Sequence, residues 1–281
     1  MIKVPVKGTG RSKWVLILNI NPGGPFGGSA TQYFVGDFDG HRFTCDSRPE
    51  TVKWMDYGKD HYATVTWSNA PDGRHIALAW MSNWQYANNV PTRQFRSSNS
   101  VPRDLYLYEQ NGETYLASSP SKEIEALRGT AIKKGNFVVN KAKEWKDFLN
   151  DNAGTYEIIA TFRPGEAEQF GLTLSNKTGE KTMFTYNLVG KTLEADRTQS
   201  GLTDFSNDFP AVTQAPIARQ KEYQLRLIVD KSSIEAFSDD GKACLTNLIF
   251  PTTPYTNLTF FSRGGKCNIT NVTIYPLSLH P

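Results

Sequence analysis

The chain has 281 residues, of which 38% are hydrophobic and 12% aromatic, and its formal net charge is +3 at pH 7. This length allows two domains or one large β unit, and the scattered lysines and arginines argue against a nucleic-acid-binding patch. No stretch approaches the roughly 18 apolar residues of a membrane-spanning helix. The apolar stretch 14–20 is short and ends at Asn-Pro-Gly-Gly, so we also expect no signal peptide in this chain.

The three cysteines do not form a metal-binding pattern. Cys45, Cys244 and Cys267 have no CxxC spacing and no histidine cluster beside them, so no zinc site is predicted. Cys244 lies in an apolar run and is expected to be a small core residue, with a Cys244–Cys267 disulfide left open as an alternative. The histidines occur singly, and the sequence predicts neither a metal nor a cofactor.

Strand signals dominate the first 119 residues. Residues 14–20 predict a buried strand, 21–29 a long turn rich in glycine and proline, and 31–40 an alternating strand that ends at an Asp-Gly turn. Short strands joined by polar turns indicate a propeller, a barrel or a sandwich. The further strand predictions are 61–67, 75–81 and a hairpin over 104–120 that turns at Asn111-Gly112.

The pattern changes near residue 120. Residues 120–129 are the best helix candidate, because Pro120 and Ser121 can begin a helix and Gly129 can end it. A second, weaker helix or turn is expected over 141–150. From residue 131 the chain again has short strand signals, typical of a two-sheet sandwich. The strand candidates there are 156–162, 170–176, 183–189, 223–230, 233–239, 244–250, 258–262 and 271–277.

The run from Asp56 to Arg103 combines acids and aromatic rings. Asp56 and Asp60 are four residues apart around a predicted turn, where they can bind hydroxyl groups, act as general acid and base, or cap the turn. Aromatic rings stack on the C–H faces of sugars, and carboxylates bind sugar hydroxyls, so this composition is typical of a sugar site.

Single residues in this pattern allow two interpretations. Trp80 ends a predicted strand beside a polar loop, which suits either a sugar platform or a core position. Glu235 lies on an alternating strand, where a structural salt bridge or a surface position is favoured over catalysis.

Several short motifs together resemble glycoside hydrolase family 32, the β-fructosidases, which include invertases, levanases and inulinases. The chain departs from many members at Phe95, where they have tryptophan, and at Ser97, where they have glycine. The resemblance implies a five-bladed β-propeller followed by a β-sandwich. The matching segments are 13–16, 27–29, 32–40, 56–63, 74–84, 91–92, 102–105, 194–201 and 232–237.

The resemblance places domain boundaries along the chain. It implies an all-β fold in which residues 1–119 form about two blades of an incomplete propeller. Residues 120–130 then form a linker helix and 131–281 a C-terminal β-sandwich.

The family mechanism is retaining hydrolysis by two carboxyl groups on either side of the scissile bond. Its nucleophile is the Asp of an NDPN-type motif, its acid/base is the Glu of a Glu-Cys motif, and a third Asp lies in an RDP motif. None of these motifs occurs in the sequence. In relatives the Glu-Cys motif comes just before the segment that matches residues 1–16, so we expect Met1 to fall just past the acid/base.

The resemblance therefore assigns sugar-binding residues but no catalytic ones. Asp56, Lys59 and Asp60 match a fifth-blade motif near the sugar pocket, and Trp80 matches a tryptophan that lines the fructose subsite. The expected ligands are fructose-containing saccharides, with sucrose, levan and inulin all open.

Three hypotheses follow from this resemblance. The chain is the C-terminal portion of a β-fructosidase that is inactive alone, or a non-catalytic fructan-binding module, or half of an enzyme completed by another chain. An open propeller face would favour self-association or binding of that other chain. Family members are often periplasmic or secreted.

Overall fold

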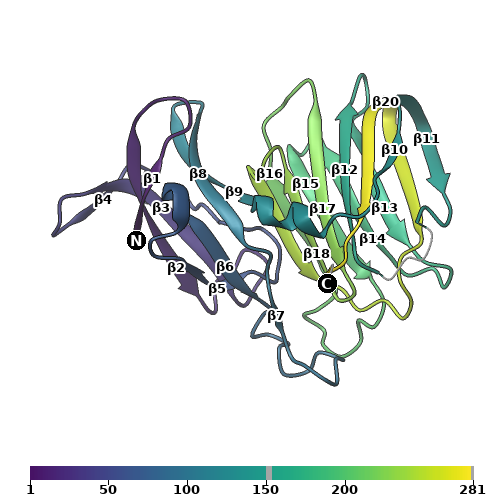
Figure 1. Ribbon diagram of the computed structural model, residues 1–281, viewed down its shortest axis with the longest axis horizontal. Helices are drawn as coiled ribbons and strands as arrows, with labels where there is room; N and C mark the ends of the chain where they lie inside the picture. The colour runs from purple at the N-terminus through teal and green to yellow at the C-terminus, as the bar shows by residue number, and fades with distance from the viewer. Residues whose placement is uncertain (150–153, 280–281) are drawn as a thin grey trace.

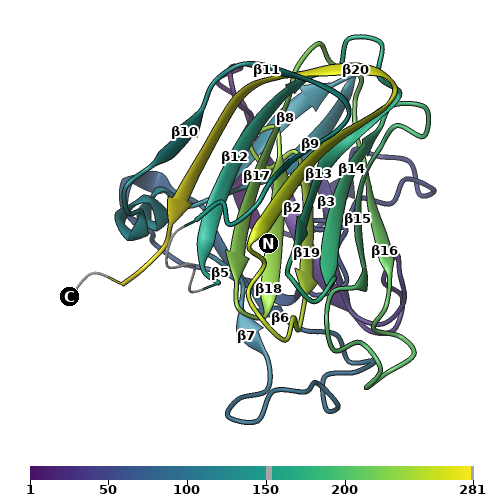
Figure 2. The ribbon, with the colours of Figure 1, turned by 90° about the vertical axis from the view of Figure 1, so that its right-hand side faces the viewer.

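The structure is almost entirely β, and its strands form two groups that follow one another along the chain (Figure 1). The computed structural model describes residues 1–149 and 154–279. The N-terminal group contains two antiparallel sheets, and the C-terminal group is a sandwich whose layers share one long strand (Figure 2). Across these described residues, no helix is long and apolar enough to cross a membrane.

Each N-terminal sheet is an antiparallel meander, the repeating unit of β-propellers. The strands of the first sheet are β1 (Ile2–Pro5), β2 (Ser12–Ile20), β3 (Ala30–Phe38) and β4 (Phe43–Cys45). The strands of the second sheet are β5 (Tyr62–Thr66), β6 (Ile76–Met81), β8 (Arg103–Gln110) and β9 (Glu113–Pro120), with β7 (Ser98–Asn99) beside β6.

Alternating side chains pack these two sheets together. Val15 of β2 and Val35 of β3 share a buried cluster with Leu105 and Leu107 of β8. Successive strand residues point to opposite faces of a sheet, so the neighbours of Val15 and Val35 line the other face, on which Leu18 is 41% exposed. The first sheet therefore buries one face and leaves apolar surface on the other.

The sandwich begins after the 3-10 helix Lys122–Leu127. One layer contains β13 (Gln169–Ser175), β14 (Lys181–Asn187), β15 (Thr192–Gln199) and β16 (Val212–Pro216). The other layer contains β12 (Tyr156–Arg163), β17 (Tyr223–Asp230), β18 (Ser233–Ser238) and β19 (Ala243–Leu248). The strands β10 (Ile132–Lys134), β11 (Phe137–Trp145) and β20 (Asn257–Pro276) complete it.

The long strand β20 passes from one layer to the other. Its residues 257–263 pair with β13, and its residues 268–276 pair with β12. Gly264 lies between these two parts with a φ of 73°, and a Cβ there would lie 2.8 Å from the side chain of Glu168. Glycine is therefore required at this bend, because it alone combines the left-handed conformation with the close approach.

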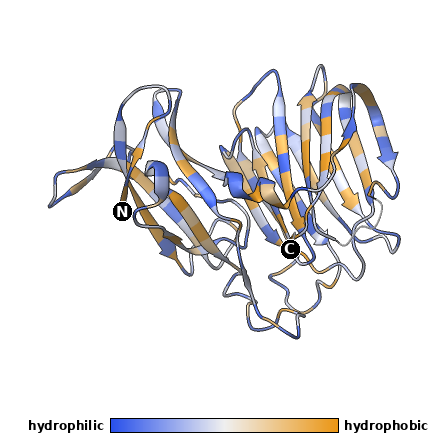
Figure 3. Cartoon of the chain, in the orientation of Figure 1, coloured by the Kyte–Doolittle hydropathy of each residue, from blue (hydrophilic) through white to orange (hydrophobic). Residues whose placement is uncertain are grey.

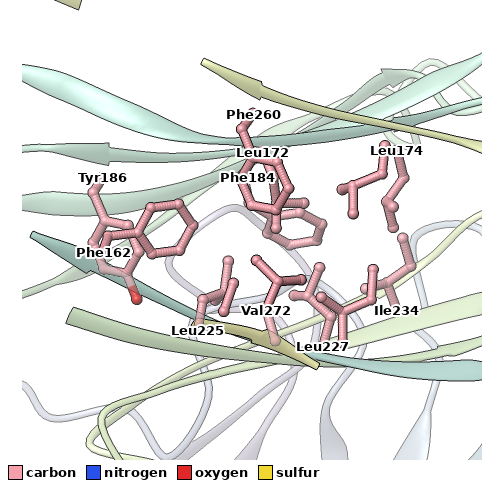
Figure 4. Packing of buried hydrophobic residues seen from close by; sticks show 14 of the residues in the cluster. Phe162, Leu172, Leu174, Phe184, Tyr186, Leu225, Leu227, Ile234, Phe260 and Val272 are labelled. Carbon is pink, nitrogen blue, oxygen red and sulfur yellow. The ribbon is translucent and has the colours of Figure 1, made fainter. Parts of the chain in front are cut away.

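The main hydrophobic core lies between the two sandwich layers (Figure 4). Leu172 and Phe184 from one layer face Leu225 and Leu227 from the other, and all four are fully buried. Figure 3 shows the same alternation as bands of hydrophobic and hydrophilic residues along the strands. This core is larger than the cluster between the N-terminal sheets, so most of the buried apolar side chains lie in the sandwich.

Every residue of β18 and β19 is buried, although these strands lie at the end of a layer. One face of β18 and β19 contributes to the sandwich core, and the other packs on the N-terminal part. Phe237 and Cys244 on that second face pack in a cluster with Val101, which lies between β7 and β8, and with Ile124 of the 3-10 helix. The two parts of the chain therefore share an extensive interface.

Several local predictions need revision. The helix expected over 120–129 is a 3-10 helix of six residues. The expected helix or turn at 141–150 is wrong for 141–145, which belong to β11, and residue 150 lies outside the described residues. The strands predicted at 258–262 and 271–277 are one strand, β20. The cysteines are free, so the open alternative of a Cys244–Cys267 disulfide is not observed.

Candidate functional site

Residues 56–60 lie along the outer edge of β19. The backbone N–H groups of Tyr57 and Asp60 donate to the carbonyls of Cys244 and Thr246, at 2.8 and 3.1 Å. Gly58 lies between them, where a Cβ would be 1.9 Å from the Thr246 carbonyl oxygen. An exposed strand edge carries backbone N–H and C=O groups without partners. Residues 56–60 supply hydrogen-bond partners for these groups along the edge of β19.

Asp56 completes the pairing at one end of this segment. Its Oδ1 accepts from the backbone N–H of Thr246 at 2.8 Å and from that of Gly58 at 2.7 Å. Its Oδ2 accepts from Arg103 Nη1 at 2.8 Å and from the Thr246 hydroxyl at 2.6 Å. Arg103 also donates to Glu235 Oε2 at 2.6 Å. A buried arginine is thus shared between an aspartate of the N-terminal part and a glutamate of the sandwich.

Asp60 does the same at the other end. Its Oδ2 accepts from the backbone N–H of Leu248 at 2.8 Å and from Arg197 Nη1 at 2.5 Å. Its Oδ1 accepts from the Tyr86 hydroxyl at 2.7 Å. The side chains of Asp60 and Arg197 are both fully buried. The two acids, four residues apart, therefore act as acceptors for alternate N–H groups of β19.

Burial and charge act in opposite directions on the ionisable groups of this interface. Burial alone would raise the pKa of Asp56, but the charge of Arg103 and the bonds from Thr246 outweigh it, so the pKa of Asp56 is lowered. For Glu235 burial prevails over Arg103 and the pKa is raised. Burial, and then the charge of Arg103, lowers the pKa of His61 to about 3, so this histidine is neutral near pH 7.

Lys59 is also held from the sandwich side. Its Nζ donates to the backbone carbonyl of Asp208 at 2.6 Å, and its side chain is almost fully buried. Burial, followed by the charge of Arg197, lowers the pKa of Lys59. The Gln85 side-chain amide donates to the Asp208 carboxylate at 3.3 Å, so the sandwich loop around residue 208 contacts the loop that follows β6.

Three aromatic rings gather where β6 ends. Trp80 and Trp84 have ring centroids 5.0 Å apart and are tilted by 41°, and Tyr62 meets Trp80 edge-on at 6.1 Å. Trp80 is partly buried, whereas Trp84 is 52% exposed. The Trp84 backbone N–H donates to the Ser29 hydroxyl at 3.1 Å, which fixes it to the glycine-rich turn. We call Tyr62, Trp80 and Trp84 the aromatic cluster.

The glycine-rich turn is fitted closely to the loop after β6. Gly28 has a φ of 69°, and a Cβ there would lie 2.0 Å from the Asn83 side-chain oxygen. Asn83 is fully buried, and its amide nitrogen donates to the Lys59 carbonyl at 2.9 Å. This turn, the loop after β6 and the segment 56–60 therefore form one connected unit beneath the aromatic cluster.

The structure thus separates the four predicted sugar-binding residues. Trp80 lies in the aromatic cluster at the surface. Asp56, Lys59 and Asp60 are at most 4% exposed, and all four carboxylate oxygens accept hydrogen bonds from protein donors. In this structure they hold the domain interface rather than face solvent, and their direct contact with sugar stays a prediction.

The sequence did not predict the partners of these acids. Arg103 is two residues from buried Leu105, and Arg197 is two residues from buried Ala195, so the strand pattern places both arginines on the inward-facing side. An arginine at an inward-facing strand position predicts a buried acidic partner, because a buried cation must be paired. This signal was present in the sequence for both arginines. Glu235 forms the structural salt bridge that was the favoured interpretation. Among the described residues no cluster of potential metal ligands occurs.

Comparisons with known protein families agree with this architecture. The family description "Glycosyl hydrolases family 32 N-terminal domain" matches residues 1–120, and "Glycosyl hydrolases family 32 C terminal" matches residues 123–276. The two matches meet at the 3-10 helix that separates the sheets from the sandwich. The chain belongs to glycosyl hydrolase family 32.

The similar proteins include levanases and exo-inulinases. The chain is 37% identical over 284 residues to a levanase from Bacillus subtilis (strain 168), a match that covers 99% of this chain and 42% of the levanase. It is 32% identical to the extracellular exo-inulinase inuE of Aspergillus niger, with 99% and 54% covered. The crystal structure of exo-inulinase from Aspergillus awamori superposes with a TM-score of 0.88 at 28% identity, with 99% and 56% covered.

These matches support the predicted fold class of propeller strands followed by a sandwich. The chain spans about half the length of the relatives it matches.

Proposed function

We propose that this chain forms one wall of a fructan-binding site in a retaining β-fructosidase. The observation that carries the proposal is the aromatic cluster: Trp80 and Trp84 present ring surface at the end of β6, in the segment that matches the family. Aromatic faces suit the C–H surfaces of fructose units. Asp56, Lys59 and Asp60 support this wall from behind through the interface with the sandwich.

The proposed wall lacks the groups that perform the chemistry. Retaining hydrolysis requires two carboxyl groups about 5–5.5 Å apart and both directed at the scissile bond. The 281 residues contain no NDPN, RDP or Glu-Cys motif. The acids Asp56 and Asp60 are paired with Arg103 and Arg197 and are not free to replace them. The chain alone is therefore proposed to be inactive.

The family's remaining propeller strands are proposed to complete the site. Apolar side chains of the N-terminal sheets remain exposed: Leu18 by 41%, Val65 by 63% and Trp67 by 48%. Propellers remove their open edges by closing into a ring, and Leu18 of β2 and Val65 of β5 lie on the two sheets that such a ring would include. Those strands, in the same protein or in another chain, would cover this surface and bring the missing carboxylates. In their absence we expect copies of this chain to associate.

Calorimetric titration with a fructo-oligosaccharide tests the proposed wall. We expect measurable binding that falls at least tenfold in Trp84→Ala, because Trp84 supplies the exposed ring. Trp67→Ala is the matched control, since Trp67 is exposed to a similar degree but lies outside the aromatic cluster. Binding that is absent, or that Trp84→Ala and Trp67→Ala change equally, would refute the proposed wall.

An activity assay tests the proposed lack of catalysis. The purified chain is incubated with sucrose, levan and inulin, and released fructose is measured against a variant carrying Asp56→Ala and Asp60→Ala. We expect no release above that of the variant. Turnover well above it would show that this chain carries a catalytic pair of its own.

A further inference from the structure

We propose that Arg197, on the sandwich strand β15, is a positioning residue for the exposed ring of Trp84. The sandwich would then determine the shape of the sugar-binding wall as well as stabilise the fold. This inference rests on the proposed function for its sugar-binding part only. The geometric part, that Arg197 holds the turn carrying Trp84, is testable without any sugar.

Arg197 joins four separate segments through one buried guanidinium group. Its Nε donates to the Phe209 carbonyl at 2.9 Å, and its Nη1 donates to Asp60 at 2.5 Å and to the Leu248 carbonyl at 3.1 Å. Its Nη2 donates to the Tyr86 hydroxyl at 2.8 Å. A planar group with fixed donors is suited to hold several acceptors in one geometry, which a lysine ammonium cannot reproduce.

Tyr86 transmits this contact to the turn that carries Trp84. The backbone N–H groups of Tyr86 and Ala87 both donate to the Asn83 carbonyl, at 3.1 and 2.9 Å, so residues 83–87 form one tight turn. The Tyr86 ring is 1% exposed and meets Phe209 edge-on at 5.3 Å. Trp84 lies within this turn, two residues before Tyr86. Fixing the Tyr86 ring from behind therefore limits where the Trp84 ring can point.

The sandwich contacts this turn at further points, in addition to the hydrogen bonds that Trp84 and Asn83 make with Ser29 and Lys59 on the N-terminal side. The Phe209 ring packs beneath Tyr86, and the neighbouring Asp208 accepts from the Gln85 side chain. The guanidinium carbon of Arg197 lies 4.0 Å from the Phe209 ring centroid. Arg197 thus orders the sandwich loop and the turn together.

Arg103 provides a matched comparison within the same interface. It is equally buried and also joins an aspartate of the segment 56–60 to the sandwich. Its partners are Asp56, Glu235 and Thr246, and none of them lies in the turn 83–87. Loss of either arginine weakens the interface, but only loss of Arg197 removes a contact of the turn.

Hydrogen–deuterium exchange of the full chain, followed by mass spectrometry, tests the geometric part. We expect Arg197→Gln to increase exchange of the amides of residues 83–87 at least tenfold, whereas Arg103→Gln leaves them within twofold of the wild type. Tyr86→Phe removes only the hydroxyl and is expected to act in the same direction as Arg197→Gln. If Arg197→Gln does not fold, the exchange measured in Tyr86→Phe decides whether the contact between Arg197 and Tyr86 holds the turn. Unchanged exchange in Tyr86→Phe, or equal increases in both arginine variants, would overturn the inference.

Titration of the same variants with a fructo-oligosaccharide tests the sugar-binding part. We expect affinity to fall at least tenfold in Arg197→Gln and to stay within twofold in Arg103→Gln. Increased exchange with unchanged affinity would overturn this part. Failure of the wild type to bind would refute the proposed function instead, and the exchange result would still decide the role of Arg197.

Discussion

Replacing Gly58 with alanine should separate the N-terminal part from the sandwich. The new Cβ would lie 1.9 Å from the Thr246 carbonyl oxygen and 2.3 Å from the Thr246 nitrogen, where real Cβ contacts stay beyond 3.0 Å. The segment 56–60 must therefore move from β19 by about 1 Å. Both obstructing atoms belong to the backbone of a central interface strand, so a side-chain rotation cannot relieve the overlap.

The size of the effect follows from the hydrogen bonds along that edge. Three of the hydrogen bonds between the segment and β19 are donated by backbone N–H groups near Gly58 and have lengths of 2.8, 3.1 and 2.8 Å: Tyr57 to Cys244, Asp60 to Thr246, and Thr246 to Asp56. A movement of about 1 Å lengthens each beyond hydrogen-bonding range. At about 1 kcal/mol of net stabilisation each, the interface should lose about 3 kcal/mol.

Urea unfolding measured by fluorescence and circular dichroism provides the assay. Gly135→Ala is the control, because a Cβ at Gly135 would have no atom within 4 Å and this glycine needs no left-handed conformation. We expect the N-terminal part of Gly58→Ala to unfold at lower urea while the sandwich keeps its own midpoint. If Gly58→Ala and Gly135→Ala agree within about 0.5 kcal/mol, the interface does not depend on this close contact.

Two further predictions concern buried charge. The folded-state pKa of His61 is about 3, below its unfolded value of about 6.5, so between these pH values the unfolded chain binds a proton at His61 that the folded chain does not. The free energy of unfolding is therefore unaffected by protonation of this residue above about pH 6.5 and decreases as the pH falls toward 3. Urea unfolding between pH 7 and 4 should show a pH dependence that is smaller in His61→Gln by up to about 1.4 kcal/mol per pH unit, and equal slopes would contradict this. Glu235→Gln should destabilise the chain less than Asp56→Asn, because loss of charge costs less where the folded state raises the pKa, as for Glu235, than where it lowers the pKa, as for Asp56. Glu235 also accepts two hydrogen bonds, whereas Asp56 accepts four. Thermal melts compare the two variants, and the reverse order would refute the assigned charges.

The sequence predicted the all-β architecture because alternation is a local signal. The strands over 156–162 and 223–230 follow the predicted ranges closely, since each alternates within a few residues. The predictions failed where tertiary contacts decide the structure. Residues 141–145 include charged side chains that suit a helix, yet they pair with β20. Strand β15 was not predicted, because the charged residues Glu194, Asp196 and Arg197 interrupt the apolar alternation of the sequence, although residues 193, 195 and 197 are buried.

The candidate site was predicted in part for a related reason. Motif matching located Asp56 and Asp60, but spacing alone cannot state which partner a carboxylate faces. Their partners Arg103 and Arg197 lie 47 and 137 residues further along the chain, and the backbone donors at Thr246 and Leu248 lie 190 and 188 residues away. Only the docking of the sandwich on the N-terminal sheets brings these groups together. Trp80 required no such information, because the end of a strand is recognisable locally.

The rate of fructose release from levan tests the account most directly. It is measured for this chain alone, for a separately produced chain that comprises the remaining N-terminal portion of the Bacillus subtilis levanase, and for the two mixed. We expect no release by this chain alone and release from the mixture that exceeds the sum of the separate chains. Hydrolysis by this chain alone at the rate of the mixture would contradict the claim that it supplies only one wall of the site.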